Sequence, residues 1–239
     1  MTSPPTQSAL PSSSRYNRPL VIVNFKAYAE ATGKNALKLA KMAENVAKES
    51  GIYVVVAPQF VDIAPIVAHT SVPVYSQHID SVTYGGHTGH VLAEAVKEAG
   101  AVGTLINHSE RRLLFKDIDA CIRRARETGL VTCVCSDTAK NSMILAHFHP
   151  DMIAVEPPEL IGSGISVSKA RPEVVSDTVS MVTQVDKEIT ILCGAGITQG
   201  EDVAAALKLG ASGVLVASGI VKAKNPKAAL LDLVSPMTD

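Results

Sequence analysis

The chain has 239 residues and a net charge of −1, and 46% of its residues are hydrophobic while only 4% are aromatic. This length allows one large domain or two small ones, and the absence of Trp requires a core built from Val, Ile, Leu and Ala. The nearly neutral charge gives no electrostatic basis for binding nucleic acid or a membrane surface, so an anionic ligand would have to be attracted locally.

The first 17 residues, "MTSPPTQSALPSSSRYN", differ in composition from everything that follows. They are rich in Ser and Pro, contain one Arg and no acidic residue, and lack apolar periodicity. We interpret residues 1–17 as a disordered extension rather than a transit peptide, which usually has more Arg and an amphipathic pattern. Residues 18–239 contain no linker and are predicted to form a single domain.

Short β-branched runs alternate with amphipathic segments from residue 20 onward. The apolar runs are continuous rather than alternating, which indicates strands buried on both faces, as in a parallel sheet covered by helices. Helical segments such as 34–50, 91–100, 117–129 and 201–210 separate them, and several end in Gly. The predicted strands are 20–24, 53–57, 74–77, 102–106, 131–135, 153–155, 191–193 and 213–217.

Eight strand–helix units in this length match a closed (β/α)₈ barrel. The alternative is an open, doubly wound sheet. That fold favours a Gly-rich fingerprint after the first strand, and "VNFKAYAEATG" contains none. No apolar stretch reaches the roughly 20 residues of a transmembrane helix. The chain has no secretory signal, and its four cysteines lack the spacing of a disulfide framework, so we expect reduced, buried thiols in a cytoplasmic protein.

In such a barrel the active site lies at the C-terminal ends of the strands. Lys26 follows the first strand by two residues, and it is either a solvated loop residue or a fixed cation for an anionic substrate. Asn24 could cap its own turn.

His108 follows the fourth predicted strand, where Ser109 and Glu110 have the character of a first helical turn. Backbone dipoles at a helix start favour the neutral imidazole, which can donate a hydrogen bond to a carbonyl oxygen. Glu110, next to Arg111 and Arg112, is most simply part of an ion-pair cluster.

The sixth predicted strand ends in "EPPELIGSG", residues 156–164. The two prolines hold Glu156 in an extended conformation, while Gly162 and Gly164 leave the distal part of the segment free to move. This arrangement is typical of a hinged flap with a carboxylate at its base.

The loops after the last two strands, 194–196 and 217–219, are rich in glycine and small residues. They are either tight turns into helices or, in a barrel, the two halves of a phosphate-binding cradle. The pairs His87/His90 and His147/His149 have metal-like spacing but no obvious further ligands, so we predict no metal site.

Four motifs in the order "NFK", "NHSERR", "VEP…IGSG" and the glycine-rich loops resemble triosephosphate isomerase, most closely its short archaeal branch, over residues 20–233. The resemblance implies a barrel enzyme without a cofactor that interconverts dihydroxyacetone phosphate and glyceraldehyde 3-phosphate in glycolysis and gluconeogenesis. Two departures are Glu159, where the best-known members have Trp, and "CGAG" in the seventh loop. The roles implied are Glu156 as catalytic base, His108 as electrophile, Asn24 and Lys26 as substrate-binding residues, Glu110 as supporting acid, and Gly162, Gly194, Ala195, Ala217 and Ser218 as phosphate-loop residues.

Two other interpretations are an aldolase-like phosphate-binding barrel, for which Lys26 is the one lysine near a strand end, and an inactive barrel acting as a scaffold. Residues 81–90, "SVTYGGHTGH", resemble the loop that family members insert into a neighbouring subunit, with Thr88 reaching the partner's site. The resemblance therefore implies a homodimer at least, and a tetramer as in the short branch.

Overall fold

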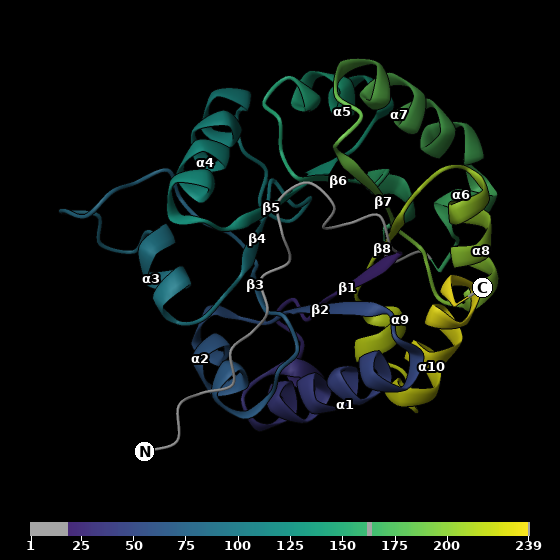
Figure 1. Ribbon diagram of the computed structural model, residues 1–239, viewed down its shortest axis with the longest axis horizontal. Coiled ribbons are helices and arrows are strands. Elements are labelled where there is room, and N and C mark those ends of the chain that lie inside the picture. The colour runs from purple at the N-terminus through teal and green to yellow at the C-terminus, as the bar shows by residue number, and fades with distance from the viewer. Residues whose placement is uncertain (1–18, 162–163, 239) are drawn as a thin grey trace.

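Residues 19–161 and 164–238 are described by a computed structural model, in which eight parallel strands form a ring surrounded by helices (Figure 1). The order around the ring is β2-β1-β8-β7-β6-β5-β4-β3, and one isolated parallel bridge between Val56 and Val74 connects β2 to β3. The predicted barrel is confirmed, and the open doubly wound sheet is wrong. The strands are β1 (Leu20–Asn24), β2 (Tyr53–Ala57), β3 (Tyr75–Ser76), β4 (Gly103–Ile106), β5 (Val131–Ser136), β6 (Met152–Val155), β7 (Thr190–Gly194) and β8 (Gly213–Val216).

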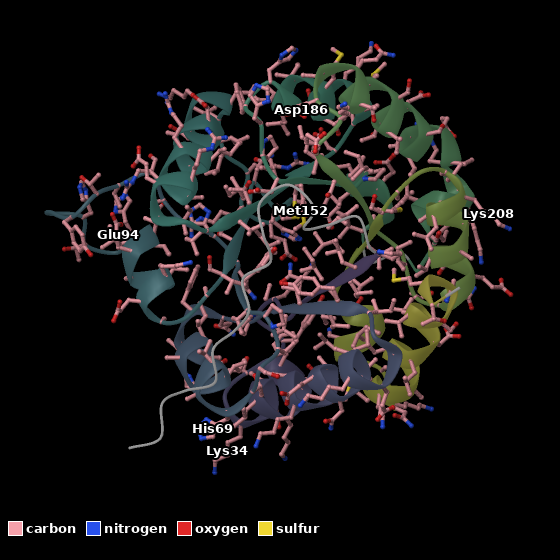
Figure 2. The ribbon with its side chains drawn as sticks, in the orientation of Figure 1. Lys34, His69, Glu94, Met152, Asp186 and Lys208 are labelled. Carbon is pink, nitrogen blue, oxygen red and sulfur yellow. The ribbon has the colours of Figure 1, made fainter. Side chains whose placement is uncertain are left out.

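Each strand is buried on both faces because alternate side chains enter two different cores. On β1, Leu20 and Ile22 belong to the cluster inside the barrel, whereas Val21 and Val23 belong to the larger cluster between strands and helices. Figure 2 shows Met152 inside the ring and Lys208 at the outer edge. The two cores explain why the strands have continuous apolar runs rather than alternating ones.

The barrel interior admits one large aromatic side chain because a neighbouring strand begins with glycine. Tyr75 on β3 is fully buried. A Cβ atom at Gly103 on β4 would lie 2.6 Å from Cε1 of the Tyr75 ring, far inside van der Waals contact. The ring and the glycine therefore fill the amino-terminal side of the barrel together.

The helices of the outer layer follow the predicted segments closely, and α1 and α4 end at Gly51 and Gly129, which have left-handed φ angles of 74° and 69°. None of the helices within the described residues is long and apolar enough to cross a membrane. The α-helices are α1 (Lys34–Ser50), α2 (Phe60–His69), α3 (Ala93–Glu98), α4 (Phe115–Thr128), α5 (Ala139–Ala146), α6 (Val167–Ala170), α7 (Pro172–Val185), α8 (Gly200–Lys208), α9 (Ser218–Val221) and α10 (Pro226–Val234). Three short 3-10 helices are η1 (Ala29–Ala31), η2 (Pro158–Leu160) and η3 (Ser235–Met237).

The segment between β3 and α3 projects from the barrel (Figure 1), and nearly all of residues 81–90 are exposed. Asp80 and Val91 close its base, since each backbone N–H is bonded to the other residue: Asp80 N–H to Val91 O at 2.9 Å, and Val91 N–H to Asp80 Oδ2 at 2.6 Å. Tyr84 near its tip is 76% exposed. The segment is thus a defined projection on a closed base.

All four cysteines are free and buried, as the sequence predicts. Cys133 and Cys135 lie in the cluster inside the barrel, and Cys121 and Cys193 lie in the outer core. Burial raises the pKa of Cys121 and of Cys193 to about 12. These side chains are therefore neutral thiols at physiological pH.

Candidate active site

A cavity of about 280 Å³ opens at the C-terminal ends of the strands. Its size suits a ligand at the small end of the range that protein pockets accept. Of the residues predicted from the sequence, Asn24, Lys26, His108, Glu156, Ala195, Ala217 and Ser218 line this cavity. Glu110 lines a neighbouring cavity, Gly194 lies behind Glu156, and Thr88 lies in the projecting segment. Gly162 lies outside the described residues.

Asn24 turns the chain so that Lys26 faces the cavity. Its Oδ1 atom accepts a hydrogen bond from the backbone N–H of Lys26 at 2.9 Å, and Lys26 has a left-handed φ of 48°. The Gln77 amide donates to Lys26 O at 2.9 Å and to Ala57 O at 3.0 Å. Asn24 therefore caps its own turn, and Gln77 holds that turn against the end of β2.

The ammonium group of Lys26 forms an ion pair across the mouth of the barrel. Its Nζ atom lies 2.9 Å from Oε1 of Glu110, and the Lys26 side chain is largely buried while that of Glu110 is exposed. The pair fixes a cation beside His108, which also lies near Glu110, with 3.6 Å between His108 Nδ1 and Glu110 Oε2.

The geometry around His108 defines which ring nitrogen carries the proton of the neutral imidazole. The backbone N–H of Glu110 donates to His108 Nδ1 at 3.2 Å, so this nitrogen must present a lone pair. The proton of the neutral ring then lies on Nε2, which faces Glu156, 3.9 Å from its Oε2 atom. His108 is thus arranged as a hydrogen-bond donor toward the cavity.

The prediction that Ser109 and Glu110 begin a helix is wrong. Residues 108–111 form a turn closed by a 2.7 Å hydrogen bond from Arg111 N–H to His108 O, and α4 begins only at Phe115. No helix forms here because the N–H of Leu113 donates to the Asn107 side chain rather than to a carbonyl of a helical turn. A single backbone N–H, rather than the N-terminus of a helix, therefore faces the His108 ring.

The Glu156 side chain is buried at the edge of the cavity. It is 6% exposed, and its Oε2 atom is buried without a hydrogen-bond partner among the described residues. Its backbone N–H donates to Ser136 O at 2.7 Å, which anchors the base of the segment to β5. A buried carboxylate oxygen without a donor contributes little to stability, and this oxygen is free to accept a proton from a substrate.

Gly194 provides the space that Glu156 occupies. A Cβ atom at this position would overlap Cγ of Glu156 and lie 2.9 Å from its Oε1 atom. Three thiols also lie near the carboxylate, and burial, followed by the negative charge of Glu156, holds the pKa of Cys135 well above its usual range. Gly194 thus packs beneath the carboxylate, and the thiols near it stay neutral.

The loop after β7 is held in an unusual backbone conformation beside the cavity. Ala195 and Gly196 are both left-handed, each with φ of 69°. A Cβ atom at Gly196 would overlap the carbonyl oxygen of Ile165, and the N–H of Val167 donates to Ala195 O at 3.3 Å. The backbone after Gly164 is therefore packed directly onto this loop.

Glu159, one of the two departures from the best-known members, lies in η2 and pairs with Arg171 at 3.2 Å. Arg171 also binds Glu173 at 2.5 Å, so the charge of Glu159 is matched outside the cavity. Nothing about this residue alters the lining of the site.

Several residues near the site were not given roles from the sequence. Tyr28 and Thr198 line the cavity, Gln77 holds the Lys26 turn, and Asn107 precedes His108. The available signal was that Gln77 ends a predicted strand and that the other three lie one to five residues after one. Within residues 19–161 and 164–238, no group of three or more His, Cys, Asp or Glu side chains is placed to hold a metal ion.

A buried carboxylate facing an imidazole N–H, with a lysine and small-residue loops at one end of a (β/α)₈ barrel, defines a barrel enzyme that transfers a proton on a small anionic substrate. The chain belongs to the triosephosphate isomerase family, whose model, described as "Triosephosphate isomerase", matches residues 19–237.

Curated relatives support this assignment. The chain is 55% identical over 215 residues to the triosephosphate isomerase of Methanocaldococcus jannaschii, covering 90% of this chain and 98% of the relative. It is 56% identical over 217 residues to that of Methanobacterium bryantii, covering 91% and 96%. The crystal structure of triosephosphate isomerase from Bartonella henselae shares the fold, with a TM-score of 0.69, 19% identity and coverage of 92% of this chain and 98% of that one.

Proposed function

We propose that this protein interconverts dihydroxyacetone phosphate and glyceraldehyde 3-phosphate through an enediolate, without a metal or cofactor. The observation that carries the proposal is the buried Oε2 atom of Glu156, which has no hydrogen-bond partner among the described residues and lies 3.9 Å from His108 Nε2. A substrate with a carbonyl group and an adjacent C–H bond supplies what both groups lack, namely a proton for the carboxylate and an acceptor for the imidazole.

In this proposal Glu156 removes a proton from the carbon next to the carbonyl group. The C–H electrons form the C=C bond of the enediolate, and the carbonyl π electrons move onto oxygen. The His108 Nε2–H group and the Lys26 ammonium group stabilise the negative charge that develops there. A proton then passes from the hydroxyl oxygen of the intermediate to the former carbonyl oxygen, and Glu156 returns its own proton to the former carbonyl carbon. The isomerisation is then complete with no net change in protons or electrons.

The phosphate group of the substrate would lie against the loops that follow β7 and β8. Ala195, Ala217 and Ser218 of these loops line the cavity, and backbone N–H groups in such loops bind phosphate in many barrels. Gly162, which lies outside the described residues, is proposed to contribute from the flap. Gly194 packs beneath Glu156, and we propose that it supports the base rather than contacting the phosphate group.

A coupled assay for glyceraldehyde 3-phosphate tests the proposal. Glu156→Gln should remain folded and bind substrate, while kcat falls by about 10²–10⁴-fold, the usual contribution of a general base. Glu127→Gln, which alters a surface carboxylate paired with Arg124, is the control and should keep wild-type turnover. A folded Glu156→Gln enzyme with wild-type turnover would contradict the assigned role.

Two further measurements separate this function from its alternatives. Dialysis against a chelator should leave turnover unchanged. Borohydride reduction in the presence of dihydroxyacetone phosphate should not modify Lys26, because its ammonium group is paired with Glu110 and acts as a charge. A trapped Lys26 adduct would favour an aldolase-like enzyme.

We also propose a homodimer in which the projecting segment enters a second cavity of the neighbouring subunit. This cavity, about 150 Å³, shares Asn24, Lys26 and His108 with the active site and is also lined by Gln77 and Glu110. Its position supports an arrangement in which the partner's Thr88 completes the site. A fully active monomer, shown by light scattering at the assay concentration, would contradict it.

A tetramer built from two such dimers is the larger assembly that we propose. It needs a second surface, and Leu114 and Phe115, 64% and 43% exposed at the start of α4, are apolar residues available for one. Activity in glycolysis and gluconeogenesis within the cytoplasm completes the proposal, and it is consistent with the assigned chemistry.

A further inference from the structure

The residue between β4 and His108 has a backbone conformation that few side chains accept. Asn107 has a left-handed φ of 61° and is 6% exposed. Glycine adopts this conformation freely, and among the other residues Asn and Asp tolerate it best. The chain therefore makes a sharp change of direction at the position that determines where His108 points.

The Asn107 side chain makes two hydrogen bonds with neighbouring backbone. Its Nδ2 group donates to Cys135 O on β5 at 2.9 Å, and its Oδ1 atom accepts from the N–H of Leu113 at 2.9 Å. The first bond fixes the exit of β4 to the end of β5. The second closes residues 107–113 into a ring, and this ring contains the His108–Arg111 turn and the Glu110 N–H that binds the imidazole.

The end of β5 sets the distance between the two reactive groups. The strand β5 lies between β4, which is followed by His108, and β6, which is followed by Glu156. Two consecutive carbonyl groups of β5 hold the two sides, because Cys135 O accepts the Asn107 amide and Ser136 O accepts the Glu156 N–H at 2.7 Å. The 3.9 Å separation between His108 Nε2 and Glu156 Oε2 thus depends on both bonds.

Only an asparagine combines tolerance of the left-handed φ angle with a donor for Cys135 O and an acceptor for the Leu113 N–H. Glycine would accept the φ angle but would leave Cys135 O and the Leu113 N–H without their partner. Aspartate would accept the angle and the Leu113 N–H, but it would place a carboxylate oxygen against the Cys135 carbonyl group. Alanine would lose both bonds and strain the backbone.

We propose that Asn107 is a positioning residue of the isomerase, which holds the His108 Nε2–H group at the correct distance and angle from Glu156. This proposal rests on the proposed function and adds a residue outside the reacting groups. Asn107 acts on turnover through His108, with little effect on substrate affinity.

The test compares Asn107→Gly and Asn107→Asp with the wild type in the coupled assay. Since a misplacement of about 1 Å costs on the order of 10²-fold in rate, kcat should fall by about 10- to 100-fold in both variants, with KM little changed. Thr132→Ala is the matched control, because Thr132 also joins β5 to the residue before β6, Asp151, through part-buried hydrogen bonds, but at the opposite end of the strand. It should lower stability without lowering kcat.

A spectroscopic measurement separates positioning from general destabilisation. In the wild type, ¹⁵N NMR of the His108 ring should show a protonated Nε2 and an unprotonated Nδ1. In folded Asn107→Gly these signals should broaden or shift, whereas in Thr132→Ala they should not.

The outcomes distinguish this proposal from the function on which it rests. A wild-type protein without isomerase activity would contradict the proposed function. An active wild type with an equally active, folded Asn107→Gly enzyme would overturn only the role of Asn107. A wild-type His108 ring protonated on Nδ1 would also overturn it, and this measurement needs no variant to fold.

Discussion

The substitution Gly194→Ala tests how closely the barrel fixes the position of the proposed catalytic base, Glu156. The added Cβ atom would overlap Cγ of Glu156 and lie 2.9 Å from Oε1, whereas ordinary contacts begin at 3.4 Å. The β7 backbone is fixed on both sides by β6 and β8, so the side chain of Glu156 has to move. A retreat of about 1 Å is needed, and a displacement of this size costs about 10²-fold in kcat.

The assay is the coupled measurement of kcat and KM, together with the melting temperature. KM should change little, because Ala195, Ala217 and Ser218, which line the cavity and are proposed to bind phosphate, are unchanged. Gly103→Ala is the control, since its Cβ atom would lie 2.6 Å from the Tyr75 ring at the other end of the barrel. Both variants should lose about 1–3 kcal/mol of stability through overpacking, but only Gly194→Ala should lose turnover. A folded Gly194→Ala enzyme with wild-type kcat would refute the placement of Glu156 or its role.

Three further predictions concern other parts of the molecule. His108→Gln should reduce kcat by at most about 10²–10³-fold, the loss of one oxyanion donor, because a glutamine amide can still donate; a larger loss in steady-state assays would mean that the ring does more than donate. Removal of residues 1–17 should leave kcat and the melting temperature unchanged, and a clear fall in the latter would show that these residues pack on the domain. Burial lowers the pKa of His78 from its usual 6.5, so the unfolded chain binds the extra proton more readily, and stability should fall as pH falls below 6.5. Urea unfolding on either side of that pH should show that the free energy of unfolding depends less on pH in His78→Gln than in the wild type. An unchanged pH dependence would assign the effect to other groups.

The strands were predictable because burial on both faces leaves short, continuous runs rich in β-branched residues, whereas the predicted helical segments are longer and amphipathic. β1 and β2 agree with the predicted 20–24 and 53–57, whereas β3 is reduced to Tyr75–Ser76 within the predicted 74–77. Gln77 accounts for part of this difference, because its side chain, rather than a further ladder pair, reaches the end of β2.

Site residues could be predicted where their position relative to the end of a strand decides where the side chain points. Asn24 is the last residue of β1, while Lys26, His108 and Glu156 follow strands, and the barrel brings all four side chains to one cavity. The roles of Gly194 and Asn107 were not predictable, because they depend on which side chain or carbonyl group of another strand lies opposite. Local propensity failed at Ser109 and Glu110 for the same reason, since a side chain from Asn107 took the N–H that a helix would have used.

The buried thiols give this protein an internal reporter of its own opening. With raised pKa values and no exposure, they can react with an alkylating reagent only after the structure around them opens. Cys121 is on the buried face of α4, where its thiol donates to Ile79 O at 3.3 Å, while Cys133 and Cys135 lie inside the ring of strands. Labelling kinetics followed by peptide mass spectrometry would therefore time the detachment of the helical layer separately from the breaking of the barrel.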